Sequence, residues 1–349
     1  MLGAPFEQGF FPCPFVSAVT LCIVCVLFSA PPVVSCSSAA PPQDSKPDWC
    51  KPLPRPEYKS LERVQVSDPW FEVYKVAPHT FAIYEPQQSE ETIGYLILGS
   101  QKAVLLDTGM GISDVHKVVM ELIKNDGTKD GGPSKPGASV NPPLQVIVLN
   151  SHTHDDHVGG NWQFDTIYSM DTGFSRQNAK GSVEDAQAEI APGEICGELP
   201  KGFDPKSYRT KPWHIIKYIH DGDTIDLGRR TIEILSTPGH TPDAITLFDR
   251  ANGLLFTGDT YYPAPIWLYR PETDMDAYAK SIARLAALGP QVRIVLGAHN
   301  IPVAPPSVLP ALVSAFADFR GGKTSCKPQG SGKQLCAVGK FQFLVRATP

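Results

Sequence analysis

Metal-binding side chains are unusually dense in one short segment of this sequence. Residues 150–160 read NSHTHDDHVGG and place His152, His154, Asp156 and His157 within six residues. Three imidazoles and a carboxylate so close together are costly to fold unless a cation neutralises and orders them. This donor set suits Zn, Fe, Mn or Co rather than Ca or Mg. The segment therefore predicts a site for a metal of the first group.

Three further side chains occur in turns that follow strand-like segments. His240 lies in STPGHTPD, Asp259 in LFTGDTYY and His299 in LGAHN. A lone histidine is usually an ordinary polar residue, but the cluster at 152–157 makes each of these a credible further ligand. Histidines without such a setting are expected to be ordinary surface or core residues: His79, His116, His214 and His220.

The elements that must position these side chains are short strands and a few amphipathic helices. Apolar runs between turn signals predict strands over 71–76, 81–85, 92–99, 103–107, 144–149, 214–219, 231–236, 244–249, 253–258 and 292–296. Helical periodicity covers 113–124, 170–190, 275–288 and 308–319. Residues 125–143 read as a loop insertion. Two sheets stacked face to face, with helices outside, would satisfy this order.

Composition limits the classes of function. The chain has 349 residues, 42% of them hydrophobic, which allows a real core and excludes an intrinsically disordered protein. Its 31 basic and 36 acidic residues give a net charge of −5. Because nucleic-acid phosphates need a basic surface, we expect no nucleic-acid partner.

The N-terminal forty residues predict an exported protein. They contain Glu7 as their one charged side chain, and residues 14–30 form the apolar run PFVSAVTLCIVCVLFSA. This run predicts a signal peptide over 1–40 and a secreted or periplasmic location. An uncleaved signal anchor, or a lipoprotein signal that acylates Cys36, are the alternatives, and either would be the chain's sole attachment to a membrane.

Segments rich in proline and glycine mark the predicted boundaries in the rest of the chain. Residues 41–64 are a Pro-rich lead-in, 65–322 hold the main domain and 323–349 form a C-terminal hairpin or tail. Four cysteines follow the signal segment. Cys326 and Cys336 flank the turn-rich stretch KPQGSGKQL and could close a hairpin, which would leave Cys50 to pair with Cys196. Four unrelated thiols are the alternative.

Five motifs, taken in order, resemble those of the metallo-β-lactamase superfamily. They are Asp107 in LLDTG, the HxHxDH run at 152–157, His240 in TPGH, Asp259 in TGD and His299 in GAH. The resemblance covers residues 92–304. It implies an α+β fold, the αββα sandwich of two stacked mixed sheets with helices on the outer faces, and a metal cleft at one edge of the sheets.

The resemblance also implies a ligand set for two zinc ions, with Fe, Mn or Co as alternative metals. One ion would take His152, His154 and His240, and the other Asp156, His157 and His299. Asp259 would bridge the two ions, and Asp107 would be a supporting residue that fixes ligand geometry.

The implied activity is hydrolysis of a small acyl substrate. Two bound cations would lower the pKa of a shared water, and this hydroxide source would serve attack on a carbonyl or phosphoryl centre without a Ser or Cys nucleophile. We expect Asp156 and Tyr262 to take part in catalysis. Tyr262 follows Asp259 by three residues, as in acyl-homoserine-lactone lactonases, and could bind an oxyanion. A structural role in the wall of the site is the alternative for Tyr262.

The predicted substrate is a lactone, an ester or a similar acyl bond, because an exported protein meets little acyl-CoA. A β-lactam or a thioester on the same di-zinc site is the alternative, although Asp259 is absent from true class B β-lactamases. Redox chemistry like that of persulfide dioxygenases, or metal binding without catalysis, is a more distant alternative. Residues 267–269, Trp-Leu-Tyr, could line an acyl site or anchor a buried loop.

Overall fold

The computed structural model describes residues 46–126, 128–129, 132–133 and 144–347 of the chain. The predicted signal segment, residues 1–40, lies outside the described residues, as do the start of the lead-in and most of the predicted insertion. Within the described ranges, no helix has both the length and the hydrophobicity needed to cross a bilayer.

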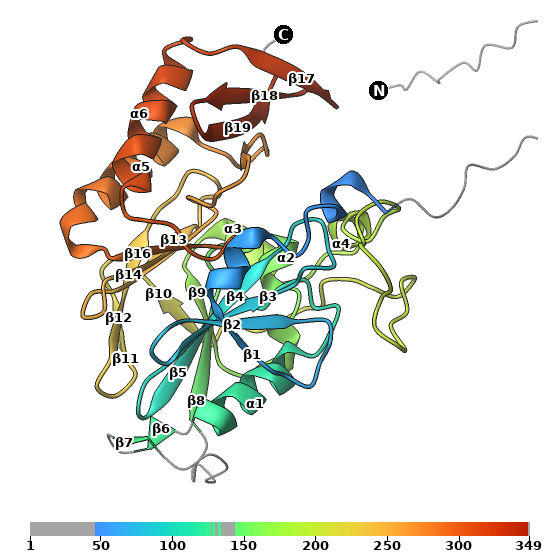
Figure 1. The fold of residues 1–349 in the computed structure, drawn as a ribbon, viewed down its shortest axis with the longest axis vertical. Helices are drawn as coiled ribbons and strands as arrows, with labels where there is room; N and C mark the ends of the chain where they lie inside the picture. The colour runs from blue at the N-terminus through green and yellow to red at the C-terminus, as the bar shows by residue number, and fades with distance from the viewer. Residues whose placement is uncertain (1–45, 127, 130–131, 134–143, 348–349) are drawn as a thin grey trace, which may run out of the picture. The chain divides into compact units, whose positions relative to one another are not determined.

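The first sheet has eight strands in the order β1-β2-β3-β4-β5-β8-β9-β10 (Figure 1). Strands β1 to β5 form an antiparallel meander, and β8, β9 and β10 continue the sheet in parallel. The sequence IGYLIL of β4 is buried throughout because both faces of the sheet are covered. The strands are β1 (Glu62–Val64), β2 (Glu72–Ala77), β3 (Thr80–Tyr84), β4 (Ile93–Leu98), β5 (Lys102–Leu106), β8 (Gln145–Leu149), β9 (Ile167–Met170) and β10 (Lys217–Ile219).

The second sheet has five strands in the order β11-β12-β13-β14-β16. Strands β14 and β16 are parallel, and the other pairs are antiparallel. An apolar cluster between the sheets joins Tyr95 and Leu149 of the first to Ile234 and Phe256 of the second. The strands are β11 (Thr224–Asp226), β12 (Thr231–Ser236), β13 (Ile245–Asp249), β14 (Leu254–Gly258) and β16 (Ile294–Gly297).

Helices cover the outer faces of both sheets. Helix α1 (Val115–Asp126) packs its buried Val and Leu residues on the first sheet, and α5 (Met275–Ala287) and α6 (Val308–Arg320) pack on the second. Asp274 caps α5 by accepting the Asp276 and Ala277 amides at 2.9 Å. The resulting layers confirm the predicted αββα sandwich.

The predicted helix over 170–190 is wrong. Strand β9 runs to Met170, and two short helices follow, α3 (Gly173–Asn178) and α4 (Glu184–Ala188). Gly181 separates them with φ +80°, and a Cβ there would lie 2.3 Å from the Thr210 carbonyl oxygen. The close approach and the left-handed backbone exclude a continuous helix at this point.

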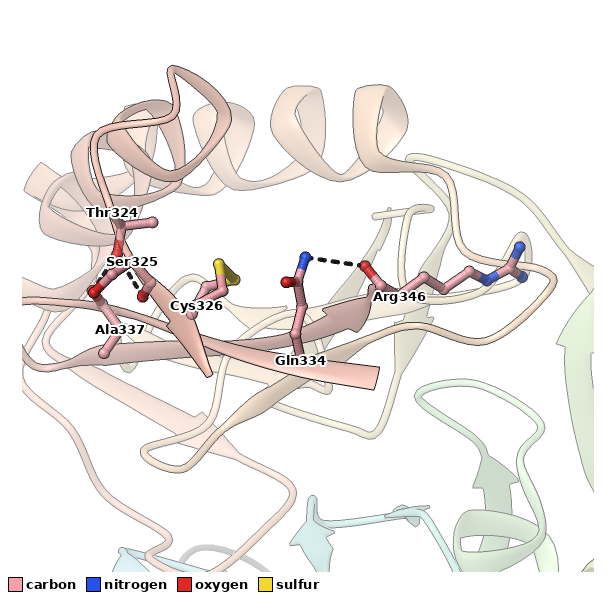
Figure 2. The surroundings of a disulfide bond; sticks show 7 residues. Thr324, Ser325, Cys326, Gln334, Ala337 and Arg346 are labelled. Atoms are coloured by element: carbon pink, nitrogen blue, oxygen red, sulfur yellow. Dashed lines mark hydrogen bonds between the residues drawn. A yellow bond between two sulfur atoms is a disulfide. The ribbon is translucent and has the colours of Figure 1, made fainter. Parts of the chain in front are cut away.

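A third sheet near the C-terminus pairs strands in the order β15-β19-β18-β17. The hairpin expected around residues 326–336 exists, with Cys326 opposite Cys336, but β15 and β19 were not predicted. Figure 2 shows this region, where the Thr324 hydroxyl donates to the Ala337 carbonyl at 2.5 Å. The domain boundaries at 65 and 322 stay predictions. The strands are β15 (Ile266–Leu268), β17 (Cys326–Gly330), β18 (Lys333–Val338) and β19 (Phe341–Arg346).

The four cysteines pair as expected, each pair at disulfide-bonding distance. Cys50 and Cys196 have Cα atoms 5.8 Å apart and join the lead-in to the segment after α4, while Cys326 and Cys336 close the hairpin. The remaining short elements are η1 (Asp48–Cys50), η2 (Pro56–Ser60), β6 (Thr128–Lys129), β7 (Gly132–Pro133), α2 (Asp155–Val158), η3 (Asn161–Gln163) and η4 (Gly289–Gln291).

Candidate metal centre

Strand ends of both sheets place the predicted ligands at one edge of the sandwich. His152 and the residues after it follow β8, Asp259 follows β14, and His299 follows β16. His240 lies in the turn between β12 and β13. At Gly258, a Cβ would lie 2.4 Å from the Ser151 Cβ, so glycine allows the loops from the two sheets to approach.

Three imidazoles meet in the first half of the site. His152 Nε2 lies 2.9 Å from His154 Nδ1, and His240 Nε2 lies 3.2 Å from the former and 3.1 Å from the latter. The His152 and His240 side chains are buried. Three ring nitrogens this close together form a ready set of metal ligands.

Hydrogen bonds made by two of these rings show which ring nitrogens carry a proton and which offer a lone pair to the cluster. His240 Nδ1 donates to the Trp267 carbonyl oxygen at 2.7 Å, and His154 Nε2 donates to Glu272 Oε1 at 2.7 Å. Because these oxygens accept, the outer nitrogens hold the protons, and the nitrogens that face the cluster are free to bind a cation.

The second half combines carboxylates with imidazoles. Asp156 Oδ2 lies 3.0 Å from His157 Nε2 and 3.6 Å from His299 Nε2. Asp259 lies between the halves, with Oδ1 3.0 Å from His299 Nε2 and Oδ2 3.6 Å from His240 Nε2. This is the position that the resemblance predicts for a bridging ligand.

Two buried polar atoms of the second half lack a hydrogen-bond partner. His157 Nε2 and Asp259 Oδ1 lie 3.0 Å from Asp156 Oδ2 and His299 Nε2, respectively, but these contacts lack hydrogen-bond geometry, and neither atom makes a hydrogen bond to any of the described residues. A buried imidazole nitrogen and a buried carboxylate oxygen without partners are rare in folded proteins, and a bound cation would satisfy both. The seven predicted ligands therefore fit the two-metal site that the resemblance implies.

Supporting contacts fix the second half in place. Asp107 Oδ2 accepts His157 Nδ1 at 3.0 Å, and its Oδ1 accepts the Ser151 amide at 2.7 Å. The backbone of Asp107 has φ 63°, a conformation that costs energy in a residue other than glycine. His299 Nδ1 donates to the Glu90 carbonyl at 2.7 Å. Asp107 thus lies where a supporting residue is expected.

The halves differ in electrostatics. Burial lowers the pKa of His240 to about 4, since its charged form would lose hydration. Burial alone would lower the pKa of His299, but the adjacent Asp259 carboxylate raises it to about 9. Burial alone would raise the pKa of Asp259, but His299 and His157 lower it to about 2.

Tyr262, the second residue predicted to act in catalysis, packs against the second half. Its ring lies 4.8 Å from that of His299. The hydroxyl donates to the Pro265 carbonyl at 2.8 Å and accepts the Trp267 amide at 3.2 Å, so it also holds the following loop. Its catalytic role stays a prediction. Leu268 is buried in β15, and Trp267 is half-buried.

Sequence reasoning missed the residues that support the first half. Glu272 orients His154, and Asp243 accepts the Thr153 and Thr241 hydroxyls at 2.6 and 2.7 Å, which joins two ligand loops. Asp243 lies three residues after His240, a local signal that could have been used. Glu272 has no such signal, because only the fold brings it to His154.

The chain belongs to the metallo-beta-lactamase superfamily, whose family model matches residues 94–299. It is a metal-dependent hydrolase of that superfamily, and the His and Asp clusters described above are consistent with a metal site typical of it. The matched region runs from β4 to His299 and contains all seven predicted ligands.

Among curated proteins, the chain is similar to the acyl-coenzyme A thioesterase MBLAC2 of Homo sapiens. The two are 27% identical over 194 residues, which is 56% of this chain and 67% of that protein. The Bos taurus protein of the same name is 24% identical over 196 residues, again 56% and 67% of the two chains. About a third of each relative lies outside the match.

Among solved structures, the chain is similar to the inverting sec-alkylsulfatase Pisa1 from Pseudomonas sp. The TM-score is 0.50 at 18% identity, over 72% of this chain and 42% of that one. Identity at this level supports the shared fold alone.

Proposed function

We propose that this metal centre hydrolyses thioesters of acyl groups. The observation that supports this substrate is the similarity to two proteins named acyl-coenzyme A thioesterases, at 24 and 27% identity. It favours the thioester, an alternative in the sequence analysis, over the lactone expected there.

The donor set defines what each part of the chain would do. Two zinc ions, when bound, would polarise the substrate carbonyl and lower the pKa of a shared water. The three imidazoles of the first half would hold one ion. The second half, with Asp259 between the two, would hold the other. Asp156, whose side chain is 14% exposed against 8% for Asp259, is the carboxylate nearer to solvent and thus to an entering substrate.

We also propose that the protein is exported. Two cysteine pairs at disulfide-bonding distance support this location, because disulfides persist in oxidising compartments. Acyl-CoA is then a test compound rather than the required substrate, and the thiol portion must be varied in the assay.

The test compares four compounds that share an octanoyl group: two octanoyl thioesters, an octanoyl ester, and a lactone whose ring carbonyl is the reacting bond. Zinc-loaded full-length protein is given octanoyl-CoA, octanoyl-N-acetylcysteamine, ethyl octanoate and N-octanoyl-homoserine lactone. His154→Ala, which lacks a predicted ligand, is the blank, and His214→Ala, at an exposed histidine, is the matched control.

We expect both thioesters to be cleaved at least about tenfold faster than the lactone, a difference of about 1.4 kcal/mol in activation free energy. The blank should be inactive and the control unaffected. Equal rates for octanoyl-CoA and octanoyl-N-acetylcysteamine would show that the enzyme recognises the acyl group rather than the thiol portion. Thioester cleavage no faster than the blank would refute the proposal.

Lactone opening is the second candidate, because Tyr262 lies against His299. Tyr262→Phe decides between its two roles. Loss of an oxyanion donor lowers kcat by about 100- to 1000-fold. A loop anchor would instead lose about 1 kcal/mol of folding stability with kcat little changed.

A further inference from the structure

A second cavity lies next to the segment that supports the first half of the metal centre. The Trp267 carbonyl and the Thr273 hydroxyl both contact His240. Between them, Leu268 and Arg270 line a cavity of about 530 Å³. The cavity extends from this segment to the C-terminal sheet and the end of α6, and contains none of the seven predicted ligands among its lining residues.

One part of this cavity is apolar. Leu268 of β15, Met275 of α5, Phe319 of α6 and Val345 of β19 face it from four different elements. Four elements that each contribute an aliphatic or aromatic side chain form a wall suited to a hydrocarbon chain.

Two guanidinium groups provide the charged part. Arg270 Nε is buried and makes no hydrogen bond to any of the described residues. Arg346 Nε donates to the Tyr269 carbonyl at 2.8 Å, which leaves its two terminal nitrogens without a hydrogen bond to the described part of the chain. Figure 2 shows Arg346 beside Gln334, whose amide donates to the Arg346 carbonyl at 3.3 Å.

Neither guanidinium has an anionic partner within the described ranges. No carboxylate oxygen of the described residues lies within 4.0 Å of Arg270 or Arg346. Asp156, Glu272 and Glu189 act on Arg270 only from a longer distance, and its guanidinium carbon lies 5.7 Å from the centre of the Tyr269 ring. Because a buried charged donor is costly to leave unpaired, Arg270 points to an anion that comes from outside the chain.

We propose that this cavity binds an aliphatic carboxylate. The hydrocarbon would lie against the apolar wall, and the carboxylate would accept hydrogen bonds from Arg270 and Arg346, since the planar guanidinium matches a carboxylate in a bidentate pair. The site goes beyond the proposed function, because it needs neither a metal nor the thioester reaction. Such an acid is also what an acyl hydrolase releases.

The test measures binding of decanoate and of decanol to the full-length protein by titration calorimetry at neutral pH. The two compounds share the hydrocarbon and differ in charge. We expect decanoate to bind at least about tenfold more tightly than decanol, as a charged hydrogen-bonded pair predicts. Arg270→Gln should remove that difference and leave decanol binding unchanged. Arg270→Lys should restore part of it.

Two further variants keep the result decisive. Arg346→Gln changes an exposed side chain and removes its hydrogen bond to the Tyr269 carbonyl, and it should weaken decanoate binding relative to decanol. His154→Ala shows whether decanoate binds at the metal centre. Decanoate binding that is lost in His154→Ala and retained in both Arg270→Gln and Arg346→Gln would overturn the proposal. Equal affinity for decanoate and decanol, or no decanoate binding by the folded wild-type chain, would overturn it as well.

Discussion

The two halves of the candidate metal centre would hold a cation with different chemistry. The first half consists of three imidazoles, and its outer support is Glu272, whose side chain is 18% exposed. The second half contains the Asp156 carboxylate beside Asp259, and its outer support is Asp107, with 1% exposure. One half thus offers lone pairs, and the other also offers charge.

The two halves also differ in how their surroundings shift the pKa values of their histidines. Burial lowers the pKa of His240 to about 4, whereas Asp259 raises that of His299 to about 9 against the effect of burial. Carboxylates are therefore concentrated in one half, where they are tolerable only if imidazoles or a cation neutralise them.

The largest effect is expected at Asp259, which approaches both halves. Asp259→Asn keeps the size of the side chain and removes its charge. Loss of a residue that only supports a ligand lowers metal affinity or activity by about 10- to 100-fold. Loss of this ligand itself should therefore lower turnover more than about 100-fold and reduce the zinc content of both halves. Elemental analysis and turnover check this, with Asp318→Asn, at a surface carboxylate paired with Lys323, as control. Wild-type zinc and turnover would contradict the bridging position.

His240→Ala and His299→Ala should separate the halves. Each variant should retain about one of about two zinc ions, because each removes a ligand from one half. The ion that remains differs, since only His240→Ala leaves the carboxylate-rich half intact. Cobalt-substituted protein should therefore give two distinct visible spectra, while His214→Ala keeps the wild-type one. Identical spectra from the two variants would show that the halves are not separate sites.

The outer supports should matter according to their burial. Asp107→Asn should weaken zinc binding by about 10- to 100-fold, and Glu272→Gln by no more than about tenfold, because water can replace an exposed acceptor. Competition with a chelator measures both. The opposite ranking would show that burial does not set the value of these contacts.

The smallest effect on zinc is expected at Arg55 of the lead-in, which donates to the buried Glu91 at 2.7 Å. Glu91 also accepts the amide of Asn300, next to His299, at 2.8 Å. Arg55→Met should cost about 2 kcal/mol of unfolding free energy, as for hydrogen bonds to charged groups. Zinc binding in the second half should weaken less than about tenfold.

Urea denaturation and chelator competition check the Arg55 prediction. Arg63→Met, at an exposed arginine paired with Glu72, should cost less than about 1 kcal/mol. Equal destabilisation by the two variants would show that the Arg55 contact is an ordinary surface pair.

The sequence predicted the strands near the site better than the segments between them. Short apolar runs such as IGYLIL and QVIVL are typical of buried strands, so β4 and β8 were predicted correctly. The stretch 170–190 has good helix formers, but Gly181 must approach Thr210, and that contact is invisible in the sequence. Strands β15 and β19 pair in parallel across about 75 residues, a distance at which local patterns give no information.

The sequence by itself determined the types and order of the candidate ligands and the cysteines available for pairing. Imidazoles and carboxylates as closely spaced as those at 152–157 have few uses other than metal binding. The tertiary structure decided which nitrogens face inward, through acceptors such as the Trp267 carbonyl and Glu272. It also placed Arg270 beside a cavity, with its Nε buried and without a hydrogen bond to the described residues. Protonation and pairing depend on contacts between distant segments, and only the folded chain creates them.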